Sequence, residues 1–98
     1  VPEVGKLYYG RVVRLMTFKK GSANLVELTL PEDSPAVGKR VRDLSFPGDG
    51  VLVAIVRDGR SRAPEQDAAV EVGDELLFTI SEEHERELSH YLVPVTKG

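Results

Sequence analysis

The stretch Val51-Leu52-Val53-Ala54-Ile55-Val56 is the longest apolar run of the chain. It has the length of a β-strand, and its β-branched side chains favour a strand over a helix. A run without polar interruptions is typical of a strand covered on both faces, so we expect it to be the central strand of a sheet. It is far too short to cross a bilayer, and we expect no direct insertion into a membrane.

A tight turn directly follows this strand. Asp58-Gly59 supplies two residues that adopt positive φ readily, as the centre of a type I′ turn requires. The sequence therefore predicts a hairpin at Asp58-Gly59, in which the chain returns through Ser61 to Ala63.

Two other segments alternate between apolar and polar residues, with the period of two that is typical of a half-buried strand. The inward residues are Val26, Leu28 and Leu30 in the first segment, and Leu76, Phe78 and Ile80 in the second. The segment from Arg11 to Phe18 fits both a helical stripe and a strand. A strand is slightly favoured, because Gly21 would then close a hairpin with the strand that follows.

Two helices are expected. Val41 and Leu44 are spaced i, i+3, which predicts one short amphipathic helix between Lys39 and Leu44. Ser81 is a favourable N-cap for a C-terminal helix from Glu82 to about Leu92, with one face formed by His84, Leu88, Tyr91 and Leu92. These elements predict the α+β class, with a small mixed β-sheet, the hairpin and the two helices.

The composition narrows the functions that the chain can have. A length of 98 residues, 41% of them hydrophobic and 30% charged, indicates one folded domain. The net charge of -3 lacks the basic field that drives nucleic-acid binding. The absence of cysteine excludes disulfides, thiolate zinc sites and a cysteine nucleophile, and it is compatible with the cytoplasm, where we expect the chain to reside.

The sequence contains no motif for catalysis. Its serines lack a Gly-x-Ser-x-Gly elbow, and the spacing of His84 and His90 directs them to different faces of the expected helix. We therefore expect neither an enzyme nor a metal site. Arg57 and Arg60 flank the Asp-Gly turn. A solvated hairpin tip is the favoured interpretation of this pair, and an anion site is the alternative.

Three segments occur in an order that is hard to obtain by chance: Pro31-Glu32-Asp33-Ser34-Pro35-Ala36-Val37-Gly38-Lys39, the strand and turn from Val51 to Gly59, and Val72-Gly73-Asp74-Glu75-Leu76-Leu77-Phe78. In this order the chain resembles TrkA C-terminal domains, also known as the C-terminal subdomain of RCK proteins (regulators of conductance of potassium). The resemblance extends from Asn24 to about Leu92.

The resemblance implies that residues 24–98 form a cytoplasmic regulatory domain that senses a small ligand and forms a homodimer. Residues 1–23 would be a connector or an extra hairpin strand from a longer parent. The implied partners are an N-terminal RCK/Rossmann-like subdomain and a membrane potassium transporter or channel, with no nucleic acid. Because similar domains occur in other ion transporters, the transported ion stays open. An interaction and dimerisation module with no small-molecule ligand is the alternative.

The resemblance also suggests where a ligand would bind. Several members of the family bind cyclic di-AMP across the dimer interface, using apolar residues and an arginine of the strand that matches the run above. We therefore expect cyclic di-AMP or another small anionic regulator, and no other cofactor, at the corresponding residues: Val53, Ala54, Ile55 and Arg57, with Arg60 beside them.

Overall fold

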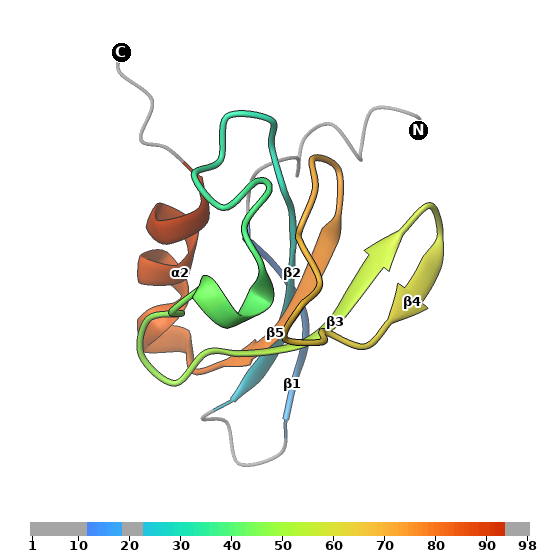
Figure 1. Ribbon diagram of the computed structural model, residues 1–98. Helices are drawn as coiled ribbons and strands as arrows, with labels where there is room; N and C mark the ends of the chain where they lie inside the picture. The colour runs from blue at the N-terminus through green and yellow to red at the C-terminus, as the bar shows by residue number, and fades with distance from the viewer. Residues whose placement is uncertain (1–11, 19–22, 94–98) are drawn as a thin grey trace.

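The computed structural model describes residues 12–18 and 23–93. Its elements are β1 (Val12–Thr17), β2 (Asn24–Thr29), the 3-10 helix η1 (Val41–Asp43), β3 (Val51–Arg57), β4 (Arg60–Arg62), β5 (Glu75–Ile80), the 3-10 helix η2 (Glu82–His84) and α2 (Glu85–Leu92). The strands form one antiparallel sheet in the order β1-β2-β5-β3-β4, and α2 covers one of its faces (Figure 1). The predicted α+β class is confirmed.

The core lies between the sheet and α2. In β2 and β5 every second residue is buried, because successive side chains of a strand point to opposite faces. The buried side chains of the sheet meet Leu88 and Leu92 of α2. Leu30 lies just beyond β2 and is also fully buried. The alternation expected from the sequence is therefore confirmed in both strands.

β3 differs from the prediction. It lies beside β5, which is the central strand of the sheet, and only one of its faces is covered. Leu52 and Ile55 enter the core, whereas Val51 is 55% exposed and Val53 is 41% exposed. The register shifts between Leu52 and Ala54, which marks an irregularity at Val53. The prediction of a central strand covered on both faces was wrong, because the described part of the chain supplies a covering layer on one side only.

The hairpin at Asp58-Gly59 is confirmed. Asp58 has φ 54° and Gly59 has φ 76°, which are the two positive values that a type I′ turn requires. This two-residue turn pairs Arg57 directly with Arg60. The returning strand β4 therefore begins one residue earlier than expected, and all of its residues are exposed.

The two predicted helices are present in modified form. Between Lys39 and Leu44 the chain forms only the short 3-10 helix η1, because Val41 N–H donates to the Ala68 carbonyl at 2.9 Å and so joins this segment to a neighbouring loop. The C-terminal helix starts with the 3-10 turn η2 and continues as α2. Ser81 is not a side-chain N-cap; its N–H and Oγ both donate to the Asp49 carboxylate at 3.1 Å.

The ambiguous N-terminal segment is a strand. β1 pairs with β2 in antiparallel register, as the slightly favoured interpretation predicted, while the expected turn at Gly21 lies outside the described residues. Arg14 extends from β1 to the first turn of α2, where its Nε and Nη2 donate to the Glu85 carboxylate at 3.2 and 3.3 Å. Glu85 also accepts a hydrogen bond from Asn24 at 2.8 Å, so β1 is joined to the core by side chains as well as by its ladder.

Candidate functional site

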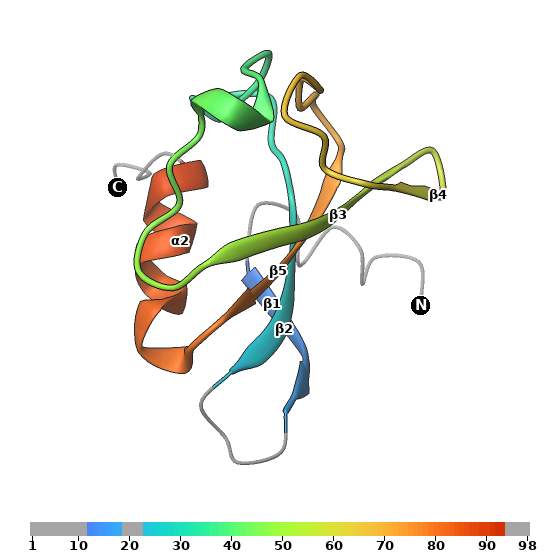
Figure 2. The ribbon, with the colours of Figure 1, turned by 60° about the horizontal axis from the view of Figure 1, so that its bottom comes forward.

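The described part of the chain leaves the face of the sheet opposite α2 uncovered, and we call this face the open face (Figure 2). The strand register orders its side chains in three rows that run across the sheet. These rows contain Met16, Leu25, Thr79 and Val51; then Val13, Glu27, Leu77 and Ala54; then Thr29, Glu75 and Val56. The open face is thus mainly apolar, with two carboxylates near its middle.

Apolar side chains at the edges of the open face are exposed. Met16 is 52% exposed and Val51 is 55% exposed, and both lie in the first row. Leu15, beside the register shift of β1, is 47% exposed. Contiguous apolar surface of this kind marks interaction sites more often than solvent-facing structure. The open face is therefore the candidate interaction surface of the domain.

The two acidic side chains of the open face come from neighbouring strands. Glu27 of β2 lies opposite Leu77, and Glu75 of β5 lies opposite Thr29, so the two carboxylates are diagonal neighbours. Burial among the strands raises the pKa of Glu27, and a hydrogen bond and repulsion from Glu75 raise it further. Like charges placed side by side on an apolar face disfavour ionisation. A positive charge brought near this pair would therefore favour the ionised carboxylates.

Arg57 lies on the other side of the sheet, where its guanidinium is already occupied. Its Nε and Nη2 donate to the two carboxylate oxygens of Asp74 at 2.7 Å each, and Nη2 also donates to the Ala69 carbonyl at 3.0 Å. Nη1 lies 3.4 Å from the Glu71 carboxylate. Asp74 is 1% exposed and accepts a further hydrogen bond from the Glu71 N–H. Arg57 thus forms a bidentate, largely buried ion pair that joins β3 to the loop before β5.

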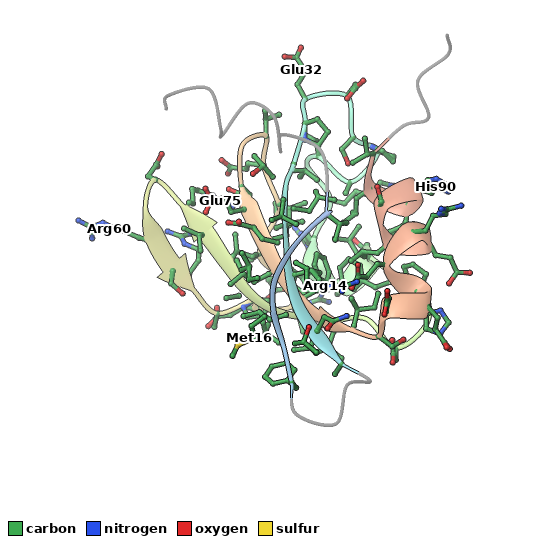
Figure 3. All side chains as sticks on the ribbon, turned by 180° about the vertical axis from the view of Figure 1, so that it is seen from behind. Arg14, Met16, Glu32, Arg60, Glu75 and His90 are labelled. Atoms are coloured by element: carbon green, nitrogen blue, oxygen red, sulfur yellow. The ribbon has the colours of Figure 1, made fainter. Side chains whose placement is uncertain are left out.

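The structure divides the five predicted ligand-binding residues between different surroundings. Val53 and Ala54 are accessible, at the irregularity of β3 and on the open face. Ile55 is fully buried in the core, and Arg57 is held by Asp74. Arg60 is exposed on β4 and extends away from the body of the domain (Figure 3). The five residues therefore do not line one pocket within a single copy.

Sequence reasoning missed Glu27 and Glu75 as a pair. Alternation placed both side chains outward, but only the register between β2 and β5 shows that they are neighbours. It also missed Arg62, which shares a side of β4 with Arg60 because the two are two residues apart. Glu27 and Glu75 are thus the charged side chains described on the open face, and Arg60 and Arg62 are the charged side chains of β4.

No group of three or more histidine, aspartate and glutamate side chains in residues 12–18 and 23–93 is arranged to hold a metal ion. His84 packs against Gly48 and contacts the Glu87 carboxylate through Nδ1 at 2.8 Å. His90 points away from the sheet on the outer side of α2 (Figure 3). Within the same residues, no helix is long and apolar enough to span a bilayer.

The family model described as the TrkA-C domain matches residues 25–93, which is most of the chain and includes β2 to α2. The chain belongs to the TrkA-C domain family. It is 53% identical over 85 residues to a Trk system potassium uptake protein TrkA from Mycobacterium tuberculosis, an alignment that covers 87% of this chain and 39% of that protein. A Trk system potassium uptake protein TrkA homolog from Archaeoglobus fulgidus is 32% identical over 67% of this chain and 15% of its own length.

A solved structure described as "Structure of RCK domain with cda" has the same fold as this TrkA-C domain. The two superpose with a TM-score of 0.62 at 29% identity, over 69% of this chain and 96% of the other. The chain spans about two fifths of the length of the first M. tuberculosis relative and a smaller share of the archaeal one. β1 lies before the residues that the family model matches.

Proposed function

We propose that this TrkA-C domain is a regulatory module of a cytoplasmic potassium-uptake regulator, and that it acts through association and ligand binding and not through catalysis. The observation that carries the proposal is an apolar open face on a member of a family whose relatives are potassium uptake proteins. The side chains of that face, with two carboxylates among apolar residues, are suited to contact with another surface.

In this proposal two copies pack through their open faces, and a bound ligand favours one relative orientation of the pair. A preceding RCK/Rossmann-like subdomain of the parent protein transmits that orientation to a membrane potassium transporter. The regulatory effect cannot exceed the difference in ligand affinity between the two orientations. An interface that is mainly apolar supplies association, and charged residues at its edge supply the selectivity for a ligand.

The proposed ligand is a small anionic regulator, with cyclic di-AMP as the first candidate. A solved relative is described as a structure "with cda", which supports a bound ligand in this domain type. Because Asp74 occupies the guanidinium of Arg57, the exposed arginines Arg60 and Arg62 are the better source of positive charge. Val53 and Ala54 would supply apolar contact, while Ile55 can act only by shaping the strand from within the core.

Isothermal titration calorimetry with cyclic di-AMP tests ligand binding, and sedimentation velocity of the same samples tests association. We expect saturable heat, a larger fraction of dimer with ligand, and loss of both responses to ligand in Arg60→Gln/Arg62→Gln. Arg86→Gln, which removes an exposed arginine of α2, is the matched control and keeps both. Dimer without heat at millimolar ligand would reduce the function to an interaction module, and a monomer without heat would overturn the proposal.

A further inference from the structure

We propose that, in the dimer without ligand, the β3–β4 hairpin of one copy lies across the open face of a second copy, where Arg60 and Arg62 pair with Glu27 and Glu75. We call the hairpin from Arg57 to Arg62 the arm. This inference rests on the proposed self-association and names the residues that hold the two copies together. It commits to a second copy of this chain as the occupant of the open face.

The open face alone is too small to form a stable interface between two copies. Four strands about 4.8 Å apart, each with about six residues at a rise of about 3.3 Å, give roughly 20 Å by 20 Å, or about 400 Å² in projection. A stable interface uses about 800 Å² on each partner. Flat packing of the two open faces therefore buries too little area. A projecting element that reaches the partner would add the missing area.

The arm is the element of the described structure that projects. β4 pairs with β3 alone, its three residues are all exposed, and the views show it extending away from α2 (Figures 1 and 2). As an edge strand, β4 leaves one row of backbone N–H and C=O groups unpaired, and such a row can pair with another chain. Such a strand is suited to gain its packing from a partner.

The charges of the arm and of the open face are complementary. Among the described side chains of the open face, the charged groups are the carboxylates Glu27 and Glu75. Within the described part of the chain, the guanidinium groups of Arg60 and Arg62 have no hydrogen-bond or ion-pair partner, and these residues pair with β3 through the backbone alone. An apolar surface with a central acidic pair fits an occupant that brings positive charge, because unpaired carboxylates covered by apolar groups would be destabilising.

The arm cannot satisfy these carboxylates within its own copy. Cross-strand partners share a face, so Arg60 lies on the side of Arg57 and Arg62 on the side of Ile55, which is the α2 side of the sheet. Glu75 lies on the opposite side, where it pairs across the strands with Val56. The ion pairs can therefore form only between copies. In a two-fold arrangement each copy gives its arm to the partner and receives the partner's arm, so the exchange is reciprocal and the assembly closes at two copies.

Charge reversal tests this arrangement by sedimentation equilibrium and by mixing. Arg60→Glu/Arg62→Glu reverses the arm, and Glu27→Lys/Glu75→Lys reverses the face. All four positions are at least partly accessible, so the fold should survive, which circular dichroism checks. We expect each variant alone to dimerise at least tenfold more weakly than the original chain. An equimolar mixture of the two should form heterodimers, and the fourfold variant should dimerise again.

The controls separate this inference from the proposed function. Arg40→Glu/Arg86→Glu reverses two exposed arginines outside the arm and should leave association unchanged. If the face-reversed variant fails to fold, Arg60→Gln/Arg62→Gln alone should still weaken association and reduce its dependence on salt. Dimers that persist with unchanged affinity in every charge variant would overturn the arm exchange and leave the proposed self-association standing. A monomeric original chain, or reversed variants that stay monomeric when mixed, would also overturn it.

Discussion

Replacing Arg57 by alanine should destabilise the domain strongly, although this residue lies at the base of the projecting arm. The substitution leaves the Asp74 carboxylate, which is 1% exposed, with only the Glu71 N–H as a partner. Removal of one member of a buried ion pair costs about 3 to 5 kcal/mol. The Arg57 side chain keeps 21% exposure, so we expect the lower end of this range, about 3 kcal/mol.

The expected loss is large enough to measure by thermal unfolding. In a domain of 60 to 100 residues, 1 kcal/mol shifts Tm by about 4 to 8 °C, so 3 kcal/mol corresponds to about 12 to 24 °C. Arg42→Ala is the control, because it breaks an ion pair with Asp67, whose side chain is 75% exposed. That exposed pair is worth at most about 1 kcal/mol.

A double-mutant cycle identifies the cause of the loss. Arg57→Ala/Asp74→Ala should be less destabilised than the sum of the two single variants, because the second substitution removes the carboxylate that the first left unpaired. The reasoning is refuted if Arg57→Ala loses less than about 1 kcal/mol, the value for an exposed pair, or if the two effects add. A loss of ligand binding in Arg57→Ala would then have to be interpreted as a direct contact.

Three other outcomes can be measured. The Glu87 carboxylate raises the pKa of His84. The stability that this pair contributes is therefore complete below about pH 6.5 and is lost as the pH rises through the raised pKa. Glu87→Gln should lower the pKa of His84 measured by NMR titration. Burial and Glu75 raise the pKa of Glu27, so the free energy of unfolding falls as the pH rises above the ordinary value of 4.5 and through the raised value. Glu27→Gln should make this free energy, measured by urea unfolding, depend less on pH in that range, and an unchanged slope would contradict this assignment. Gly48→Ala, with φ 61° and an added Cβ 2.3 Å from His84 Cγ, should lose about 1 to 3 kcal/mol in thermal unfolding, and an unchanged Tm would show that the loop adapts freely.

The elements that follow from local sequence rules were predictable. The turn at Asp58-Gly59 has strict backbone requirements, and the alternation around Leu28 and Phe78 directly reports which side of a strand is buried. The family was also predictable, because its motifs are ordered along the chain. These features depend on residues that are close in sequence, which is why sequence reasoning captures them.

The errors arose where distant segments decide the outcome. The apolar run around Val53 is equally compatible with one covered face and with two, and only the placement of the helix decides between them. Ser81 has a side chain that can cap a helix, but its hydroxyl donates to the carboxylate of Asp49 in a distant loop instead. Arg57 appeared free beside the turn because its partner Asp74 lies beyond a long loop. The prediction that Arg57 contacts a ligand stays a prediction.

The attachment of β1 determines how a mechanical load from the upstream chain would enter the domain. A tension along β1 is parallel to the strand and perpendicular to its hydrogen bonds with β2, so the bonds are loaded together in shear and do not open one at a time. The Arg14–Glu85 contact carries part of the same load into α2. A displacement of the upstream chain would therefore move the sheet and α2 together as a rigid body. Such rigid-body motion is required if a change in the orientation of the domain is to be transmitted to another part of the protein.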